Sequence, residues 1–343
     1  MKICKEISRF VLGASYLLAL ASCDSTIYDD GGECTPEVRF TYDWNMKFAD
    51  AFSPEVSTVD LYVFDAQGKY LKKFTSMTNS LVLSGIADGQ YTFVALSTFT
   101  HPEAIVTPLA FQVPNLTQGS STVDDLTAIL ALQGTEVTTD INPLYHSYDG
   151  RDNAYVLPAT VKGNTVSIGT KADNVIPMMK DTNSIRVSLQ QLSGKALNAE
   201  GFTFTIESAN TQYNGDNSFV AGAPRVTYFP WAMSGGHADM EGIAGDALNV
   251  IVAEFTVGRL VPADKPILTV TNPAGQVVFR IPLVDYLLLV KGNYNRRMTD
   301  QEYLDRQDEY TMTFFLDERG DWFDARIYIN SWAIVRNNEV LHN

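Results

Sequence analysis

Hydrophobic and polar residues alternate along the first half of the chain in short runs, a pattern typical of half-buried β-strands. In the run 38–42, for example, Val38, Phe40 and Tyr42 fall on one face. Turn-forming residues separate successive runs at intervals of roughly ten residues, which favours a sandwich of short strands. The strands predicted in this half are Val38–Tyr42, Val59–Phe64, Tyr70–Phe74, Leu81–Leu83, Tyr91–Leu96 and Thr165–Ile168.

The same alternation continues in the second half, after an interruption around 177–183 where we place a domain boundary near Asp181. The fold class predicted is mainly β, with two tandem Greek-key β-sandwich domains over 37–181 and 182–343 and a few short helices. The order of strands around VFDAQGK and SGIADGQYTFVAL resembles transthyretin-like sandwiches. The strands predicted here are Ile185–Leu189, Phe202–Ile206, Val250–Leu260, Ile267–Thr271, Val277–Ile281, an alternating run from Tyr310, and a last pair around Ile327–Asn330 and Trp332.

Helical signals are local. The segment 121–132 offers hydroxyl side chains that can cap a helix, acidic residues in the first turn and apolar residues at helical spacing, so it predicts one short helix packed on the first sandwich. A second helical turn is predicted after Thr299, which can cap the amides ahead of it. Glu302 there stands at the position of a capping-box acid.

The first 22 residues have the pattern of a secretory signal, because basic residues precede an apolar run, 10–20, that is too short to span a bilayer. The small residues that follow, ending at Ser22 and Cys23, resemble the lipobox of bacterial lipoproteins. That resemblance implies cleavage between Ser22 and Cys23 and acylation of Cys23, since several acyl chains anchor a protein more stably than one. We expect a signal peptide over 1–22 and a lipidated tether over 23–36; an ordinary cleaved signal is the alternative.

Charge and cysteine content narrow the possible partners. The formal net charge is −15, and it becomes −17 without the signal, which carries a net charge of +2. A chain with this net negative charge is not expected to bind nucleic acid, because the phosphate backbone would repel it. The nearest candidate for a second apolar span, Ile281–Val290, is short and interrupted by polar residues. No disulfide is predicted, because Cys4 leaves with the signal and acylation of Cys23 leaves Cys34 without a partner.

The most distinctive motif lies between Met298 and Leu341, where YLDRQDEYTMTFFL precedes a tryptophan and INSW. Together with the lipobox, the Cys34-Thr35-Pro36 segment and the LYVFD strand at 61–65, it resembles the FimB/Mfa2 family of fimbrial anchor lipoproteins of Bacteroidetes. The resemblance covers most of the chain. It implies a minor, lipid-anchored fimbrial subunit on the outer membrane, built as two transthyretin-like sandwiches, that attaches the fimbrial shaft to the cell surface.

The partners that this resemblance implies are fimbrial shaft subunits and the outer-membrane lipid that holds the acylated Cys23. Shaft subunits join when a strand enters an incomplete sheet and pairs its open backbone groups. Terminal strands leave a sheet with least disruption, so we expect the partner contact in the C-terminal strands. The candidate residues are Arg326, Ile327, Tyr328, Ile329, Asn330, Trp332 and Ile334. The alternative is that Trp322, Tyr328 and Trp332 are only core and edge residues of the second sandwich.

The resemblance also separates anchors from shaft subunits. An arginine-specific protease trims shaft subunits after export, whereas an anchor should keep its lipid and lack that cut. The first basic residue after Cys23 is Arg39, which falls inside the predicted strand Val38–Tyr42. The tether itself offers no basic residue, which favours an anchor.

No catalytic or metal-binding motif accompanies these features. The four histidines are scattered, and no HExxH, GxSxG, P-loop or GxGxxG pattern occurs. The acidic cluster at 300–309 could supply a carboxylate pair, but Arg297, Arg306 and the helix cap explain it as a solvated, paired surface. We predict no enzymatic activity, no cofactor and no small-molecule substrate.

A surface lipoprotein that binds glycan is the alternative function, because exposed aromatic rings can stack on sugars. The candidate rings are Tyr228, Phe229 and Trp231, or Tyr145 and Tyr148 beside His146. Coplanar rings on one open face would favour sugar binding, and burial between sheets would favour the fimbrial role. A tip subunit or minor pilin of the same fimbrial system is a further alternative.

Overall fold

The computed structural model describes residues 37–87, 89–98, 107–148, 165–168, 174–191, 197–238, 248–292, 295–317, 319–329 and 332–333. The predicted signal peptide and tether, with Ser22 and Cys23, lie outside these ranges, as do Asn330 and Ile334. Their predicted roles therefore stay predictions.

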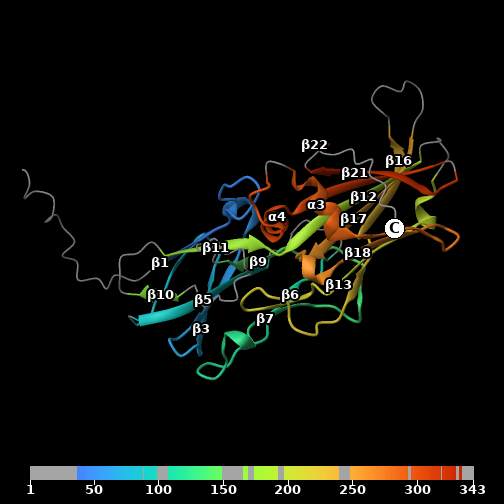
Figure 1. The fold of residues 1–343 in the computed structure, drawn as a ribbon. Helices are drawn as coiled ribbons and strands as arrows, with labels where there is room; N and C mark the ends of the chain where they lie inside the picture. Colours follow the sequence, from blue (N-terminus) through green and yellow to red (C-terminus); the bar gives the residue numbers. More distant parts are fainter. Residues whose placement is uncertain are drawn as a thin grey trace, which may run out of the picture. The chain divides into compact units, whose positions relative to one another are not determined.

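The first half of the chain builds an eight-stranded mixed sheet, as the alternating pattern indicated (Figure 1). Its first strand, β1, is an interior strand, because its backbone pairs with β11 on one side and β4 on the other. Val38 and Phe40 are fully buried, whereas Arg39 between them is exposed. The strands in spatial order are β3 (Tyr70–Ser76), β2 (Val59–Phe64), β5 (Gly89–Thr98), β9 (Leu144–Ser147), β11 (Asn174–Lys180), β1 (Glu37–Thr41) and β4 (Ser80–Val82), with β10 (Thr165–Ile168) on β5.

The second half builds a six-stranded sheet and most of a five-stranded sheet. The six-stranded sheet has the order β16 (Ala232–Ala238), β17 (Leu248–Gly258), β12 (Thr182–Gln191), β20 (Glu309–Leu316), β21 (Trp322–Ile329) and β22 (Trp332–Ala333). The five-stranded sheet has the order β19 (Val277–Pro282), β18 (Ile267–Thr271), β13 (Thr203–Ser208), β15 (Val226–Tyr228) and β8 (Glu136–Val137). All the strands predicted in both halves are confirmed, with small shifts at their ends.

Segments of the first half also enter the sheets of the second. β8 pairs with β15, and β7 (Thr127–Leu130) lies between β6 (Phe111–Gln112) and β14 (Gln212–Asn214) in a three-stranded sheet. β11 leads into β12 with only Asp181 between them, and Figure 1 shows the two as one long ribbon. The division into domains near Asp181 stays a prediction.

The helices are short. Those in the described residues are α2 (Phe52–Glu55), α3 (Leu283–Leu288) and α4 (Asp300–Arg306), with 3-10 turns at Val123–Asp125, Ala199–Gly201, Pro262–Asp264 and Leu289–Lys291. No helix in the described part of the chain is both long and apolar enough to cross a membrane.

The predicted helix over 121–132 is wrong. The Asp125 carboxylate accepts from the Thr122 N–H at 2.7 Å, as a capping residue should, but the turn that follows is a single 3-10 turn. The chain then continues as β7, because Ala128 and Leu130 alternate into the core and the backbone pairs with β6 and β14. Tertiary pairing outweighs the local helical preference here.

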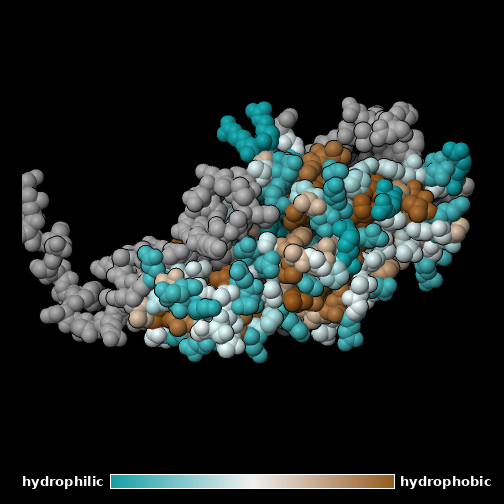
Figure 2. Space-filling view, turned by 60° about the horizontal axis from the view of Figure 1, so that its bottom comes forward, coloured by the Kyte–Doolittle hydropathy of each residue, from teal (hydrophilic) through white to brown (hydrophobic). Residues whose placement is uncertain are grey.

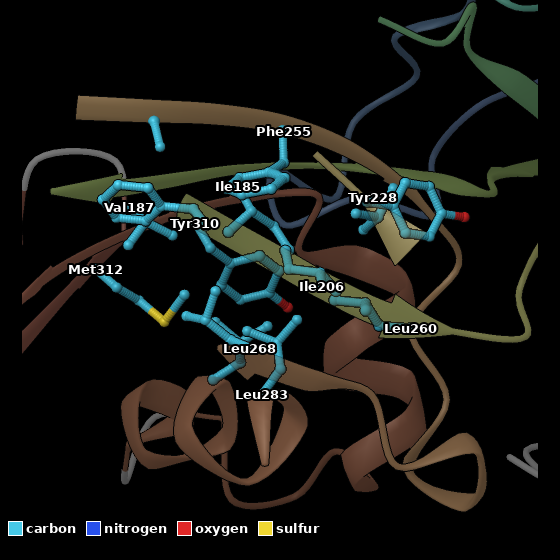
Figure 3. Close-up of a cluster of buried hydrophobic side chains, with 14 of the residues drawn as sticks. Ile185, Val187, Ile206, Tyr228, Phe255, Leu260, Leu268, Leu283, Tyr310 and Met312 are labelled. Atoms are coloured by element: carbon cyan, nitrogen blue, oxygen red, sulfur yellow. The ribbon is translucent and has the colours of Figure 1, made fainter. Parts of the chain in front are cut away.

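The largest core fills the space between the six-stranded and five-stranded sheets. Alternate side chains from both sheets meet in one hydrophobic cluster, with α3 closing one end. Burial of each large side chain contributes about 1.5–3 kcal/mol, so a core of this size accounts for folding without a disulfide. Figure 3 shows part of it: Ile185 and Val187 of β12, Phe255 of β17, Tyr310 and Met312 of β20, Ile206 of β13, Leu268 of β18 and Leu283 of α3.

The face of the molecule shown in Figure 2 is largely polar. In Figure 2 hydrophilic residues cover much of the face shown, and brown hydrophobic residues interrupt them in separate patches. Among the large hydrophobic side chains that stay exposed are Met77, Phe48, Trp231 and Met233. Scattered exposed apolar residues of this kind are common on folded proteins.

Candidate functional site

The C-terminal edge of the six-stranded sheet is the candidate partner interface. β21 pairs along its length with β20, from Thr311↔Tyr328 to Leu316↔Trp322. On its other side it pairs with the two-residue strand β22, through Tyr328 and Ile329 only. Within the described part of the chain, residues 323–327 therefore have a strand on one side alone. A row of backbone groups is left there for an added strand.

The aromatic cluster behind β21 fixes the start of this strand. Phe279 of β19 stacks on Phe314 of β20, with ring centroids 4.2 Å apart. The half-buried Trp322 packs near both, at 5.5 Å and 6.0 Å between centroids. Offset and edge contacts of this kind add about 0.5–1.5 kcal/mol beyond area burial. The alternative that Trp322 is a structural residue is therefore supported.

The candidate partner residues divide between the two last strands. Arg326, Ile327, Tyr328 and Ile329 lie in β21, and Trp332 lies in β22. The structure thus places these five in one antiparallel pair of strands at a sheet edge, and their role as a partner interface stays a prediction. Asn330 and Ile334 lie outside the described residues.

Among the described residues, β1, the strand that follows the predicted tether, has strand partners on both sides, unlike residues 323–327 of β21. β1 runs parallel to β11, from Val38↔Asn174 to Thr41↔Pro177, and antiparallel to β4. Arg39 lies in the middle of this strand, which confirms the predicted position. A protease needs an accessible extended backbone, and here the backbone around Arg39 has strands on both sides.

The acidic cluster at 300–309 is paired, as predicted, but much of it is not solvated. Asp305 of α4 is 3% exposed at its side chain and forms a bidentate pair with Arg259, with N–O distances of 2.8 Å and 2.7 Å. Arg259 also donates to the Asn217 carbonyl at 2.9 Å. Arg259 follows β17, so sequence neighbours gave no sign of this partner. The prediction of a solvated surface is wrong because the fold brings a distant cation onto α4.

Arg306, at the end of α4, ties the second half of the chain to the segment after β1. It pairs with Glu302 at 3.0 Å, which takes Glu302 away from the predicted capping-box bond. Its Nη1 donates to the carbonyls of Asp43 at 3.3 Å and Asn45 at 3.4 Å. The guanidinium also lies 3.8 Å from the centroid of the Trp44 ring, a cation–π contact. The predicted cap by Thr299 is confirmed, since its hydroxyl oxygen accepts from the Glu302 N–H at 3.1 Å.

Asp181, between β11 and β12, is a fully buried carboxyl group. One carboxyl oxygen accepts from the Asn217 side-chain amide at 3.0 Å, and the other has no hydrogen-bond partner among the described residues. Burial raises the pKa of Asp181 to about 7, against the opposing effects of Arg259 and Asn217. This group therefore titrates near neutral pH.

The rings proposed as a sugar platform do not form one. Tyr145, Tyr148 and Tyr228 are buried. The Tyr228 hydroxyl donates to the Asn210 side chain at 2.6 Å inside the fold. Phe229 is half-buried, and Trp231, at 44% exposure, is the one ring of the five that is exposed. Sugar binding is expected to show coplanar rings on one open face, so the burial of these tyrosines favours the fimbrial role. No group of three or more potential metal ligands occurs among the described residues.

Solved structures with the same fold come from related bacteria. A candidate adhesin from Bacteroides thetaiotaomicron VPI-5482 is 28% identical, with a TM-score of 0.72 over 90% of this chain and 100% of that one. A candidate polysaccharide-binding protein from the same organism is 27% identical, with a TM-score of 0.68 over 89% and 99%. The fimbrial anchor protein Mfa2 from Porphyromonas gingivalis has a TM-score of 0.57 at 19% identity, over 87% and 97%. No curated protein matches the sequence significantly.

The fold places the chain among β-rich proteins with an Mfa2-like architecture. Over residues 31–338 the sequence matches the fimbrillin-A associated anchor proteins Mfa1 and Mfa2, and because that match spans most of the chain, the chain belongs to this family. It is accordingly a non-enzymatic, fimbria-associated anchor protein of the cell surface, which confirms the resemblance and the prediction that it is not an enzyme.

Proposed function

We propose that this protein is the lipid-anchored subunit that holds a fimbrial shaft on the outer membrane. Acylated Cys23 would supply the membrane contact, and the ectodomain, built as two transthyretin-like sandwiches, would supply the contact with the shaft. The family name associates its members with fimbrillin, so the proposed partner is a fimbrillin-type shaft subunit.

The observation that carries this proposal is the position of β1. An anchor must keep its N-terminal lipid joined to its folded part, and β1 is the first described element after the predicted tether. Val38 and Phe40 are fully buried, and strands flank β1 on both sides. Cleavage at Arg39 would require this interior strand to open, which supports retention of the lipid.

The shaft contact is proposed at β21 and β22. A strand of the shaft subunit would add along residues 323–327 of β21 and pair the backbone groups that face away from β20. The short strand β22 would be displaced or extended, since only two residue pairs hold it. This assignment separates the membrane contact, before β1, from the shaft contact at the end of the chain.

The test compares two cysteine variants in the native host. Cys23→Ala removes the predicted acylation site, and Cys34→Ala is the matched control, because it removes the other cysteine of the predicted mature chain. Electron microscopy would count and measure fibres on cells and in the medium. We expect Cys23→Ala to give long or shed fibres and Cys34→Ala to behave as wild type.

Unchanged fibres in a stable, membrane-released Cys23→Ala protein would refute the anchor role. A glycan array would then test sugar binding, with Trp231→Ala as the variant for the exposed ring. Loss of fibres in both variants would instead show that the phenotype reflects folding and not acylation.

A further inference from the structure

The strand directions around β1 are relevant to any force that reaches the tether. β1 is parallel to β11 through four residue pairs and antiparallel to β4 through three. β11 continues into β12 in the same direction, and β12 is parallel to β20 through eight pairs, from Ser184↔Glu309 to Gln191↔Leu316. β1, β11, β12 and β20 therefore all run in one direction, from the Glu37 end of β1 towards the Leu316 end of β20.

Two kinds of separation are possible for such a strand. If β1 is pulled along its axis against the far end of β20, all its backbone pairs are loaded together. If it is pulled sideways at one end, the pairs break one after another. A single hydrogen bond contributes only about 0.5–1.5 kcal/mol net in water, so sequential peeling meets low resistance and simultaneous shear meets high resistance. The direction of the load decides the strength of the attachment.

We propose that β1 is a mechanical clamp that carries tension between the membrane tether and the far end of the six-stranded sheet in shear. This inference rests on the proposed function, in which the tether bears the pull of an attached fibre. The side chains support the backbone pairs: Val38 and Phe40 are fully buried and must leave the core together when β1 slides. Phe40 stacks on Phe52 of α2, with ring centroids 6.2 Å apart.

The segment behind β1 contributes a second attachment. Arg306 of α4 donates to the carbonyls of Asp43 and Asn45, and the Tyr42 N–H donates to the Asp50 carboxylate at 2.9 Å. Lys180, at the end of β11, pairs with Asp308 at 2.7 Å, just before β20 begins. Load that enters β1 can thereby pass to α4 through the segment after β1, and from β11 to the start of β20 through Lys180, so it does not depend on the β1 pairs alone.

The test is single-molecule force spectroscopy in two pulling geometries. The full chain, with Cys4→Ser and Cys23→Ser, carries one DNA handle on Cys34 and a second on an introduced cysteine. Arg319→Cys lies in the turn after β20 and pulls β1 in shear. Val82→Cys is 52% exposed at the residue paired with Glu37, and pulling there peels β1 from its end. We expect a rupture force several-fold higher in the shear geometry.

Two substitutions at one exposed position sharpen this test. Arg39→Pro removes a backbone donor inside β1, whereas Arg39→Ala removes the same side chain and keeps the donor. We expect Arg39→Pro to lower the shear rupture force and Arg39→Ala to leave it unchanged. Equal rupture forces in the two geometries would overturn the proposal, as would equal shear forces for the two Arg39 variants. If Arg39→Pro does not fold, the comparison of geometries decides alone.

The two experiments can refute the mechanical clamp and the anchor role independently of each other. Shed fibres from Cys23→Ala cells together with equal rupture forces would refute the clamp and leave the anchor role in place. A high shear force together with unchanged fibres would refute the anchor role, and with it the premise that the tether bears a fibre.

Discussion

Replacing Arg259 by methionine would test whether the buried ion pair with Asp305 holds α4 in place. Both side chains are almost completely buried, at 2% and 3% exposure, and two N–O contacts of 2.8 Å and 2.7 Å join them. Methionine keeps much of the length and apolar stem of arginine but removes every donor. Asp305 would then keep only the Gln301 amide donor at 2.7 Å.

The expected loss of folding stability follows from the Asp305 charge, which stays buried without its partner. Removing one partner of a buried pair typically destabilises by about 3–5 kcal/mol, because the remaining ion has lost its solvent and its counter-charge. The matched control is Arg186→Met, whose salt bridge with Glu254 is 54% exposed on the arginine side. That substitution should cost at most about 1 kcal/mol, since exposed pairs are weak.

Urea denaturation followed by tryptophan fluorescence at pH 7 would measure both free energies of unfolding. The double variant Arg259→Met/Asp305→Leu should recover most of the loss, because an apolar pair of similar volume avoids a buried unpaired charge. If Arg259→Met costs no more than Arg186→Met, the reasoning about the buried pair is wrong. If the double variant is no better than the single one, packing and not charge explains the loss.

Two further predictions concern buried groups near this pair. Asp181→Asn should gain stability relative to wild type as pH rises from about 4 to 7, by up to about 4 kcal/mol at pH 8. The pKa raised to about 7 means that the folded state keeps a proton which the unfolded chain loses near pH 3.8, so wild-type stability falls across this window. Urea denaturation would contradict this prediction if the free energy of unfolding of Asp181→Asn differed from that of wild type by the same amount at pH 5 and pH 8. Gly258→Ala should destabilise by about 3 kcal/mol or more, because its Cβ would overlap the Asn210 carbonyl oxygen and the Tyr213 hydroxyl. Gly236→Ala, with only an ordinary contact to a valine, is the control, and urea denaturation would measure both free energies of unfolding.

The buried pairs also bear on how the two halves of the chain are joined. Arg306 reaches the backbone after β1, and Lys180 reaches Asp308 before β20. Strands β6, β7 and β8, from the first half, enter sheets with strands of the second. An anchor built this way would transmit tension through many contacts, which agrees with the role proposed for β1.

The strands were predictable because their signal is local. In β13, Phe204 and Ile206 are buried and the residues between them are not, so the period of two is visible in the sequence itself. The same holds for β18. The predicted range of β2 also agrees with the structure, although both faces of that strand are buried over most of its length. Burial of one face of a sheet imposes this alternation wherever the strand lies in the chain.

The segment 121–132 shows where local signals fail. Thr122 and Asp125 form the capping contacts that a helix start would have, yet the chain leaves the turn and becomes β7. The deciding partners are β6 and β14, and β14 lies about 80 residues further on in the sequence. A three-residue turn gains too little from its own hydrogen bonds to resist that pairing.

The mainly β fold class and the positions of most strands could be predicted from the sequence, because alternation is a property of neighbouring residues, and the family resemblance of its motifs supplied the expectation of a fimbrial anchor. The folded structure was needed to show that β1 is an interior strand, that Asp305 meets Arg259 away from solvent, and that β21 lies beside a two-residue strand at a sheet edge. Those properties depend on which distant segments meet. Strand partners and ion-pair partners are chosen by the packing of the whole core, and no local pattern records that choice.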